Sequence, residues 1–425
     1  MRIGIIGLLR LLPGVAVGLL PVPSSIAAPI VATDILVERI GGTAGFTGSV
    51  STPGSAATAV YLDEFTRVAA QSAPVQTIAM PTVVSGSNNM LTDSGSDSSE
   101  GLIARSVDGS VIIVPGYNGA VGTAGITASS PGTVARTIGL VDASGTVDTS
   151  RIFKDGASSS FRSAASDDAQ RFWVSTQGNS LAPGLRLYSG SGTTSTPVLL
   201  SKGRDVGIFG GRLFVSASSS DPGIGVFPVG TGLPTSMAST GFVIASGSGT
   251  GSSSPYQFVF FDLNSNDYAG TGLDTLYIAD DRDVAGGGGL QKWAYDGTSW
   301  SLQYIITAGL PAGTAGGLRG LAGDLVNGNV ILFATDAGTT SGSVLGNALW
   351  TVTDTGAGST FSKIIDSPEN TYFRGVSLAP VAVPEPGMMT MLGMFVLALT
   401  LRCRSGAIAG RRGGACTGGV AAVVA

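Results

Sequence analysis

Histidine is absent from this 425-residue chain, and cysteine occurs only twice, at Cys403 and Cys416. Both cysteines lie at or beyond the end of an apolar run near the C-terminus, so the long body before them contains no thiol. Ser-His-Asp and Cys-His catalysis are therefore excluded for the body, as are disulfide bonds and metal sites with His or Cys ligands. Any enzyme built on this body has to use carboxylates, tyrosines, arginines, lysines or a metal held by oxygen ligands.

Charge is also scarce, since Asp, Glu, Lys and Arg make up 12% of the chain, with 28 acids against 23 bases. Six of the arginines lie near the two ends, so the body is more acidic than the whole chain, whose net charge is −5. An acidic body is a poor partner for nucleic acid, and we expect none. Glycine is abundant, with 65 residues, and the apolar residues form short β-branched and aromatic runs. This pattern predicts many strands joined by turns.

The first 28 residues have the pattern of a secretory signal peptide. Arg2 supplies a positive start, residues 3–20 are mostly apolar, and the small residues Ala27 and Ala28 offer a cleavage site. Prolines inside this stretch disfavour a buried strand and a membrane helix. We expect export of the chain and a mature form that begins near Pro29.

Four segments of the body share an arginine followed by small and apolar residues, and three of them continue with a turn and a strongly apolar strand. They are "FRSAASDDAQRFWVST" from Phe161, "GRDVGIFGGRLFVSAS" from Gly203, "LRGLAGDLVNGNVILFATD" from Leu318 and "FRGVSLAP" from Phe373. Looser copies begin at Glu100 and Tyr256. The hairpins and the strand-like runs after them predict four strands per unit, which is typical of a β-propeller blade.

The two ends of the body complement each other. The last unit is a single strand over residues 372–380, and the N-terminal region offers three strands without the shared hairpin. Pairing the two ends completes one blade and leaves no unpaired sheet edge. We therefore predict an all-β fold, a six-bladed β-propeller within residues 29–382, with seven blades or a β-solenoid as alternatives. Residues 85–99 and 246–254 are expected to be loops between blades.

The arginines that the units share are the main candidate ligand-binding residues: Arg162, Arg204, Arg319 and Arg374. If the small-residue strands are innermost, these side chains lie at the beginnings of the strands, around a central funnel. There they suit a carboxylate, phosphate or sulfate, which arginine binds through bidentate hydrogen bonds. The alternative is that each arginine pairs with an acid of a neighbouring blade, such as Asp205 or Asp324, and fastens the blades together.

A candidate metal site lies in the stretch "DLNSNDYAGTGLD". Asp262, Asn264 and Asn266 have the one, three, five spacing of calcium loops with oxygen ligands, although the expected glycine and glutamate are missing. The stretch loosely resembles the calcium loops of FG-GAP propeller repeats, with Asp274 displaced by an insertion. The alternative is a turn stabilised by Asp and Asn side chains, without a cation.

A charged cluster follows another predicted strand, at Asp280, Asp281, Arg282 and Asp283. Two carboxylates on either side of a sugar perform acid–base catalysis in glycosidases and lyases. The alternative is a solvated loop, and we assign no catalytic residue.

Several aromatic residues have the chemistry to stack on sugars, but most of them fall within strand runs, so core packing is the expectation. They are Trp173, Trp293, Trp300, Trp350, Tyr117 and Tyr256.

Residues 383–404, "VPEPGMMTMLGMFVLALTLRCR", combine Pro384, Glu385 and Pro386 with a 14-residue uncharged run and the arginines Arg402 and Arg404. A helix of that length spans about 21 Å, which is shorter than the ~30 Å hydrocarbon core. This order of features resembles the PEP-CTERM sorting signal of Gram-negative bacteria. The resemblance implies a short membrane helix and recognition by exosortase, a transpeptidase-like protease of the inner membrane.

Proteins with this signal are associated with bacteria that produce exopolysaccharide and form biofilms or flocs. The body is similar to secreted propellers of unassigned activity that carry the signal, on the stretches "SSEGLIARSVDG" and "TYFRGVSLAP". Family signals end soon after the basic cluster, whereas residues 405–425 add an atypical basic and small-residue tail.

These features predict an exported, non-enzymatic propeller that is anchored transiently in the inner membrane and then reaches the cell surface or matrix. We expect it to bind an extracellular polymer, such as exopolysaccharide, or a protein. The alternative is a His-free polysaccharide hydrolase or lyase that depends on carboxylates or calcium. Apart from this calcium, we expect no cofactor.

Overall fold

The structure is a computed structural model that describes residues 27–51, 53–178, 184–219, 222–241, 243–245, 253–338 and 346–382. The predicted signal peptide, apart from its cleavage site, and the predicted sorting signal and tail lie outside these ranges. The described residues form an all-β fold in which every pair of named strands is antiparallel. Four short 3-10 helices interrupt it: η1 (Ile126–Ala128), η2 (Tyr268–Gly270), η3 (Val284–Gly286) and η4 (Gly313–Gly316). No helix in the described ranges has the length and hydropathy to cross a bilayer.

Three of the sheets contain four strands each, consecutive in the sequence. They are β9 (Phe161–Ala165), β10 (Phe172–Thr176), β11 (Leu185–Tyr188) and β12 (Ser195–Leu199); β16 (Pro255–Phe261), β17 (Thr275–Asp280), β18 (Gly289–Tyr295) and β19 (Trp300–Ile306); and β20 (Leu318–Val326), β21 (Asn329–Asp336), β22 (Ala348–Thr353) and β23 (Ser362–Asp366). A fourth sheet has three strands, β13 (Val206–Phe209), β14 (Arg212–Ser219) and β15 (Gly223–Pro228). An isolated bridge between Val229 and Thr240 extends it.

The largest sheet joins the two ends of the described chain in the order β24-β1-β2-β4-β6-β7-β8, with β3 beside β2 and β5 beside β6. Its strands are β1 (Ile35–Ile40), β2 (Ala57–Phe65), β3 (Gln76–Ala79), β4 (Thr92–Ser94), β5 (Ala104–Arg105), β6 (Val111–Tyr117), β7 (Arg136–Asp142), β8 (Val147–Phe153) and β24 (Tyr372–Leu378). β24 pairs with β1, and Ile35 lies opposite Leu378. The predicted pairing of the two ends is therefore confirmed.

One loop expectation is wrong in part, because residues 85–99 contain β4. β3 pairs only with the second half of β2, from Tyr61 to Glu64. The backbone groups of Ala57 to Ala59 are not paired with β3, and they pair with β4 instead. β4 also pairs with β6 at Thr92, so it links the N-terminal strands to the next group of strands.

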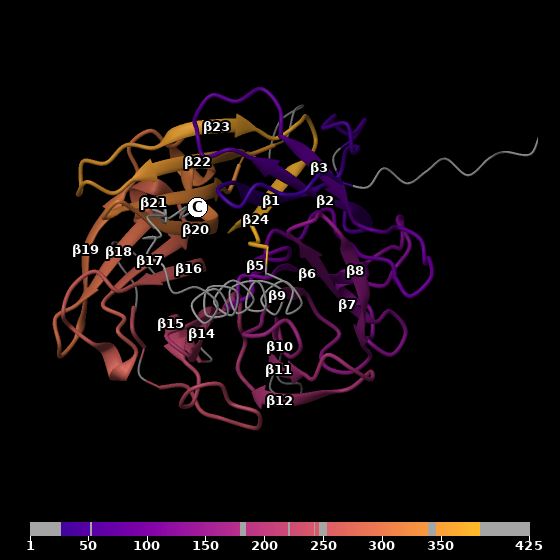
Figure 1. The fold of residues 1–425 in the computed structure, drawn as a ribbon, viewed down its shortest axis with the longest axis horizontal. Coiled ribbons are helices and arrows are strands. Elements are labelled where there is room, and N and C mark those ends of the chain that lie inside the picture. The colour runs from indigo at the N-terminus through magenta and orange to yellow at the C-terminus, as the bar shows by residue number, and fades with distance from the viewer. Residues whose placement is uncertain are drawn as a thin grey trace, which may run out of the picture.

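The sheets are arranged around a common centre in a propeller-like fold (Figure 1), with β5, β9, β16, β20 and β24 near the centre. β24 contacts β5 and β20, β20 contacts β16, and β13 contacts both β16 and β9, while β9 contacts β5. One cavity of about 240 Å³ is lined by residues of all six of these strands. The shared small-residue strands are thus the inner ones, as the sequence predicted.

Hydrophobic clusters fill the spaces between neighbouring sheets. One of them, for example, joins Val37 of β1 and Phe373 of β24 to Phe333 of β21 and Ile364 of β23. Because a sheet between two such clusters is covered on both faces, its strands have nearly continuous apolar runs rather than strict alternation. Every residue of β1, "ILVERI", is buried, including its two charged residues.

Small residues on the inner strands allow their backbones to approach closely. A Cβ on Gly375 of β24 would lie 2.5 Å from the backbone nitrogen of Ile103 and 2.7 Å from the carbonyl oxygen of Gly101. Gly320 of β20 is equally confined by the carbonyl of Arg374. Larger side chains at these positions would force the inner strands apart.

Candidate functional site: an arginine cluster

The four candidate arginines lie at the beginnings of inner strands. Arg162 is the second residue of β9, Arg319 the second of β20 and Arg374 the third of β24, while Arg204 comes two residues before β13. The parallel bridge between Leu102 and Ser163 shows neighbouring inner segments running in the same direction. The structure therefore brings these side chains to one end of the central region, and we call them the arginine cluster.

Tyr256 organises two members of the cluster. The guanidinium carbon of Arg204 lies 4.1 Å from the centroid of the Tyr256 ring, and that of Arg319 lies 5.7 Å from it. Cations at these distances are attracted to the electron-rich face of an aromatic ring. Arg204 Nη1 also donates to Ser254 Oγ at 2.8 Å, which fixes the side chain against the next sheet.

Arg162 and Arg374 are held by backbone carbonyls. Arg162 Nη1 donates to the carbonyl of Gly203 at 2.8 Å, and Arg374 Nη2 donates to the carbonyl of Ser94 at 3.0 Å. Arg162 Nε and Arg374 Nη1 are buried without a hydrogen-bond partner in the described structure. Burial lowers the pKa of Arg162, and the positive charge of Arg204 lowers it further.

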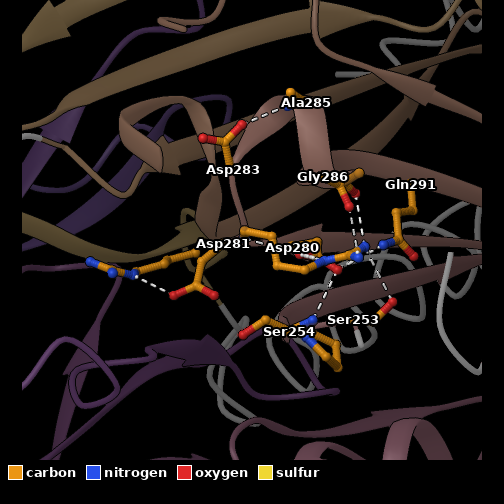
Figure 2. A network of polar contacts seen from close by, with 12 residues as sticks. Ser253, Ser254, Asp280, Asp281, Asp283, Ala285, Gly286 and Gln291 are labelled. Atoms are coloured by element: carbon orange, nitrogen blue, oxygen red, sulfur yellow. Dashed lines mark hydrogen bonds and ion pairs between the residues drawn. The ribbon is translucent and has the colours of Figure 1, made fainter. Parts of the chain in front are cut away.

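Only Arg319 of the four forms an ion pair with a described carboxylate, Asp281 Oδ2 at 3.2 Å (Figure 2). The alternative of an acid from a neighbouring blade is thus borne out for Arg319, but the two examples named from the sequence, Asp205 and Asp324, are wrong. Asp324 pairs with Arg67 at 2.5 Å. Asp205 is buried, and burial raises its pKa well above the usual value, although the nearby Ser163 hydroxyl group acts in the opposite direction. Arg162, Arg204 and Arg374 donate hydrogen bonds to carbonyl and hydroxyl oxygens instead, because the inner strands contain few acids.

A cavity of about 240 Å³ opens beside Arg319 and Arg374. Polar residues such as Asn347, Tyr372 and Ser96 also line it, together with the apolar residues Pro53, Leu102 and Phe373. Burial raises the pKa of Tyr372, while the positive charges of Arg374 and Arg319 act in the opposite direction. The cavity therefore combines two cations with neutral polar groups, which is suitable for an anionic group.

Three acids that the sequence analysis missed lie behind Arg374. Glu38, Asp93 and Glu100 are fully buried, and Tyr117 donates a hydrogen bond to Glu100. Burial raises the pKa of Glu38 to about 8 and that of Asp93 to about 7. Burial and the charge of Asp93 raise the pKa of Glu100 as well.

These raised pKa values affect the charge of the site, because a carboxyl group contributes no negative charge beside Arg374 at pH values below its raised pKa. The signal in the sequence was Glu38 inside the otherwise apolar run of β1, beside the buried Arg39. An acid in such a strand has to be buried, and a buried acid is neutral, paired or functional.

The Asp280 cluster is an ordered network rather than a solvated loop, so that interpretation is wrong (Figure 2). Asp280 is fully buried and accepts hydrogen bonds from Arg282 Nε at 2.9 Å, Gln291 Nε2 at 2.8 Å and the Ser254 backbone N–H at 3.0 Å. Asp283 accepts from the backbone N–H of Ala285 and caps η3. A carboxylate surrounded by donors and removed from solvent is poorly placed to attack a polymer.

The candidate calcium loop is closed by its own hydrogen bonds. Asp274 is buried and accepts from the backbone N–H groups of Leu263 and Asn264, the latter at 2.6 Å. Asn264 Oδ1 accepts from the backbone N–H of Asn266 at 2.7 Å, while Asp262 lies on the exposed rim. The described residues contain no cluster of three acids close enough to share a metal. Calcium binding here stays a prediction.

The remaining predicted residues take different places. Trp173, Trp293, Trp350, Tyr117 and Tyr256 are buried, as expected for core packing, whereas Trp300 is half-buried. Ala27 and Ala28, at the predicted cleavage site, lie before β1, and the Ala28 carbonyl accepts from Gln76 Nε2. The predicted sorting residues lie outside the described ranges.

No family model matches the chain, and no curated protein matches it by sequence. Among solved structures, it shows a likeness to a complex from S. cerevisiae, a variant of dbp5 bound to nup159, a variant of gle1, IP6 and ADP. The identity is 9%, the TM-score is 0.27, and the match covers 65% of this chain and 62% of that chain. This chain therefore spans less than two thirds of that chain's length, and so weak a likeness identifies neither fold nor function.

Proposed function

We propose that this chain is an exported, non-enzymatic β-propeller of six blades, whose arginine cluster binds an anionic group of an extracellular polymer or protein. The blade count is supported by the contacts of the inner strands, which lead from β5 through β9, β13, β16 and β20 to β24 and back to β5. Each step of this circuit has its own hydrophobic cluster between neighbouring sheets.

The observation that carries the binding proposal is that three of the four cluster arginines form no ion pair with a described carboxylate. Arg162, Arg204 and Arg374 have no ion-pair partner among the described carboxylates, in a protein whose overall charge is negative. Arg374 is buried, Arg162 and Arg204 are half-buried, and the negative charge of Asp97 acts on Arg162 and Arg374 without pairing with either. Cations removed from water without an ion pair are costly, and an incoming carboxylate, phosphate or sulfate would supply further negative charge. The adjacent cavity, which Arg319 and Arg374 line together with polar and apolar residues, leaves room for that group.

The test uses the chain purified from the exported fraction of cells. Retention on immobilised polygalacturonate, an anionic polymer, is compared with retention on dextran, a neutral one. We expect selective retention by polygalacturonate that is weakened about tenfold or more in the Arg162→Gln/Arg204→Gln variant. Arg151→Gln is the matched control, because Arg151 already pairs with Asp148 away from the cluster.

Thermal unfolding separates binding from a purely structural role. If the double variant melts at a much lower temperature while its retention is unchanged, the arginines serve to fasten blades and the binding proposal fails. The enzyme alternative makes a different prediction, namely shorter polymer products. Product formation that is abolished by Asp283→Asn, with the fold intact, would favour the hydrolase or lyase.

We also propose that residues 383–404 sort the protein through an exosortase-type protease, with a transient stay in the inner membrane before release to the surface or matrix. The support is the order of Pro384, Glu385 and Pro386, the short apolar run and the basic residues after it. In a Gram-negative host with an exosortase, Glu385→Ala should retain the protein in the membrane fraction. Normal release of that variant would contradict the proposal.

A further inference from the structure

A third cavity lies at the opposite end of the sheets from the arginine cluster. The register places the end of β16 beside the start of β17, since Phe261 pairs with Thr275, and Thr275 in turn pairs with Ala294 near the end of β18. The turn between β18 and β19 is therefore at the far end of the inner strand from Tyr256. A cavity of about 520 Å³ is formed there between this turn, η2 and the start of β14.

Half-buried aromatic rings surround this cavity, which we call the aromatic pocket. Tyr295 and Trp300 have ring centroids 5.5 Å apart with an angle of 37° between their planes. Tyr268 packs edge-on against both, at 5.4 Å from Tyr295 and 5.5 Å from Trp300. Trp293 lines the same cavity. Trp293 is buried in a hydrophobic cluster against which Tyr268 and Trp300 pack, while Tyr268, Tyr295 and Trp300 are half-buried and line the cavity.

Arg212 is the single charged residue among the described residues that line the aromatic pocket. Its guanidinium carbon lies 5.9 Å from the Tyr268 ring centroid, and its Nη2 donates to the carbonyl of Gly230 at 3.1 Å. It forms no ion pair with a described carboxylate, and its Nε has no hydrogen-bond partner there. The Nε atom is buried, so an anion in the pocket would meet the exposed part of the guanidinium group, whose positive charge has no ion-pair partner among the described residues.

Hydroxyl groups complete the pocket at its rim. Thr298 and Ser299 line it, and both are exposed. Asp296 holds their turn in place, because its Oδ1 accepts from the backbone N–H groups of Thr298 and Ser299, each at 2.8 Å. The polar rim is thus ordered before any ligand arrives.

We infer that the aromatic pocket binds a hexuronate unit, a sugar ring that carries a carboxylate, within an acidic polysaccharide. The volume falls in the range of ligand sites, which combine apolar and aromatic walls with a few placed polar groups. A pyranose ring offers an apolar face of C–H groups to the aromatic rings, and its hydroxyl groups suit Thr298 and Ser299. The carboxylate is the group that Arg212 binds best.

This inference names a site separate from the arginine cluster, and it rests on the proposed function only in that the ligand is an extracellular polymer. Trp293 and Trp300 provide a local signal, since quenching of tryptophan fluorescence reports a ligand in this pocket. No tryptophan lines the cavity beside Arg319 and Arg374. Quenching of tryptophan fluorescence therefore reports the aromatic pocket, whereas retention on polygalacturonate reports both sites. Retention that is weakened in Arg162→Gln/Arg204→Gln while quenching persists assigns the lost part to the arginine cluster.

The experiment titrates the exported chain with trigalacturonate, and with galactotriose as the neutral counterpart. We expect saturable quenching by trigalacturonate alone, with affinity reduced about tenfold or more by Arg212→Gln. The matched control is Arg171→Gln, because Arg171 lies 5.1 Å from the ring of Trp173 but is paired with Asp167 outside the pocket. Its affinity should equal that of the unmodified chain.

Tyr295→Leu provides a second test if Arg212→Gln does not fold, and it should weaken binding while leaving the melting temperature within a few degrees. Binding that survives in the Arg162→Gln/Arg204→Gln variant would support a site independent of the arginine cluster. The inference is overturned if millimolar trigalacturonate gives no saturable signal. Equal quenching by galactotriose, or unchanged affinity in folded Arg212→Gln, would overturn it too.

Discussion

The side-chain amide of Gln257 donates to the carbonyl of Ile103 at 2.9 Å, across 154 residues of sequence. Gln257 Oε1 accepts in return from the backbone N–H groups of Leu321 at 3.1 Å and Val376 at 3.2 Å. One buried side chain thus connects β16 to β20, to β24 and to the segment before β5. Gln257 occupies the position at which four of the other repeat units have an arginine. Its side chain forms hydrogen bonds with backbone groups of neighbouring inner segments.

We expect Gln257→Leu to lower the free energy of unfolding by about 2–4 kcal/mol, because three buried backbone groups lose their partners. Urea unfolding measures this change. Gln303→Leu is the control at an exposed amide that contacts only Ser301, and it should alter stability by less than about 0.5 kcal/mol. Equal effects of the two substitutions would show that the central hydrogen bonds contribute little.

Gly375→Ala tests the close approach of the inner strands. The added Cβ would lie 2.5 Å from the Ile103 nitrogen, so the backbone of β24 or its neighbour has to move, at a cost of about 1–3 kcal/mol. Gly358→Ala adds the same methyl group where nothing lies within 4 Å, and its stability should be unchanged or slightly higher. A melting temperature for Gly375→Ala equal to that of Gly358→Ala would contradict the packing argument.

Stability should decrease with rising pH because of Glu38, whose pKa is raised from 4.5 to about 8. Below pH 4.5 the carboxyl is protonated in both states. Between pH 4.5 and about pH 8, the Glu38 carboxyl ionises in the unfolded chain but stays protonated in the folded chain. The free energy of unfolding therefore falls by about 3–5 kcal/mol across this pH range. Glu38→Gln should remove that part of the decrease and gain stability relative to the unmodified chain at pH 8.

The measurement is urea unfolding at several pH values between 4 and 9, roughly the range over which this linkage acts. Glu369→Gln, at an exposed position, serves as the control and should keep the pH dependence of the unmodified chain. If Glu38→Gln keeps it as well, Glu38 is not the group responsible.

Removing calcium should leave the fold unchanged, because the loop from Asp262 to Asp274 is held by Asp274 and Asn264 through backbone N–H groups. We expect equal melting temperatures with chelator and with millimolar calcium. A calcium-dependent increase that is lost in Asp262→Asn would instead identify a true calcium site. Asp267→Asn helps to distinguish the two, since Asp267 accepts only from the Gly272 N–H within the described loop.

Pattern and composition were sufficient for much of the architecture. The repeated arginine and small-residue strands predicted β9, β20 and β24, and the pairing of β1 with β24 followed from counting strands at the two ends. β4 escaped notice because a three-residue strand has no periodicity of its own; it forms only because β3 leaves part of β2 unpaired.

The candidate sites were less accessible to sequence reasoning. Local spacing suggested acids as partners of the arginines, yet hydrogen bonds to Gly203, Ser94 and Ser254 depend on how separate sheets meet. The same holds for the aromatic pocket, where Arg212 and Trp300 belong to different sheets. No window of sequence contains both.

By itself, the sequence determined the chemistry that is excluded, the all-β class and the position of four arginines at the beginnings of inner strands, because these follow from residue types and local periodicity. Only the tertiary structure decided which charges are balanced and which are not. It buries Glu38, Asp93 and Glu100 behind Arg374 and leaves Arg162 and Arg204 without an ion pair to any described carboxylate. The physical reason is that pKa values, ion pairs and cavities depend on burial and on distances through space, which arise only when sheets distant in sequence pack together.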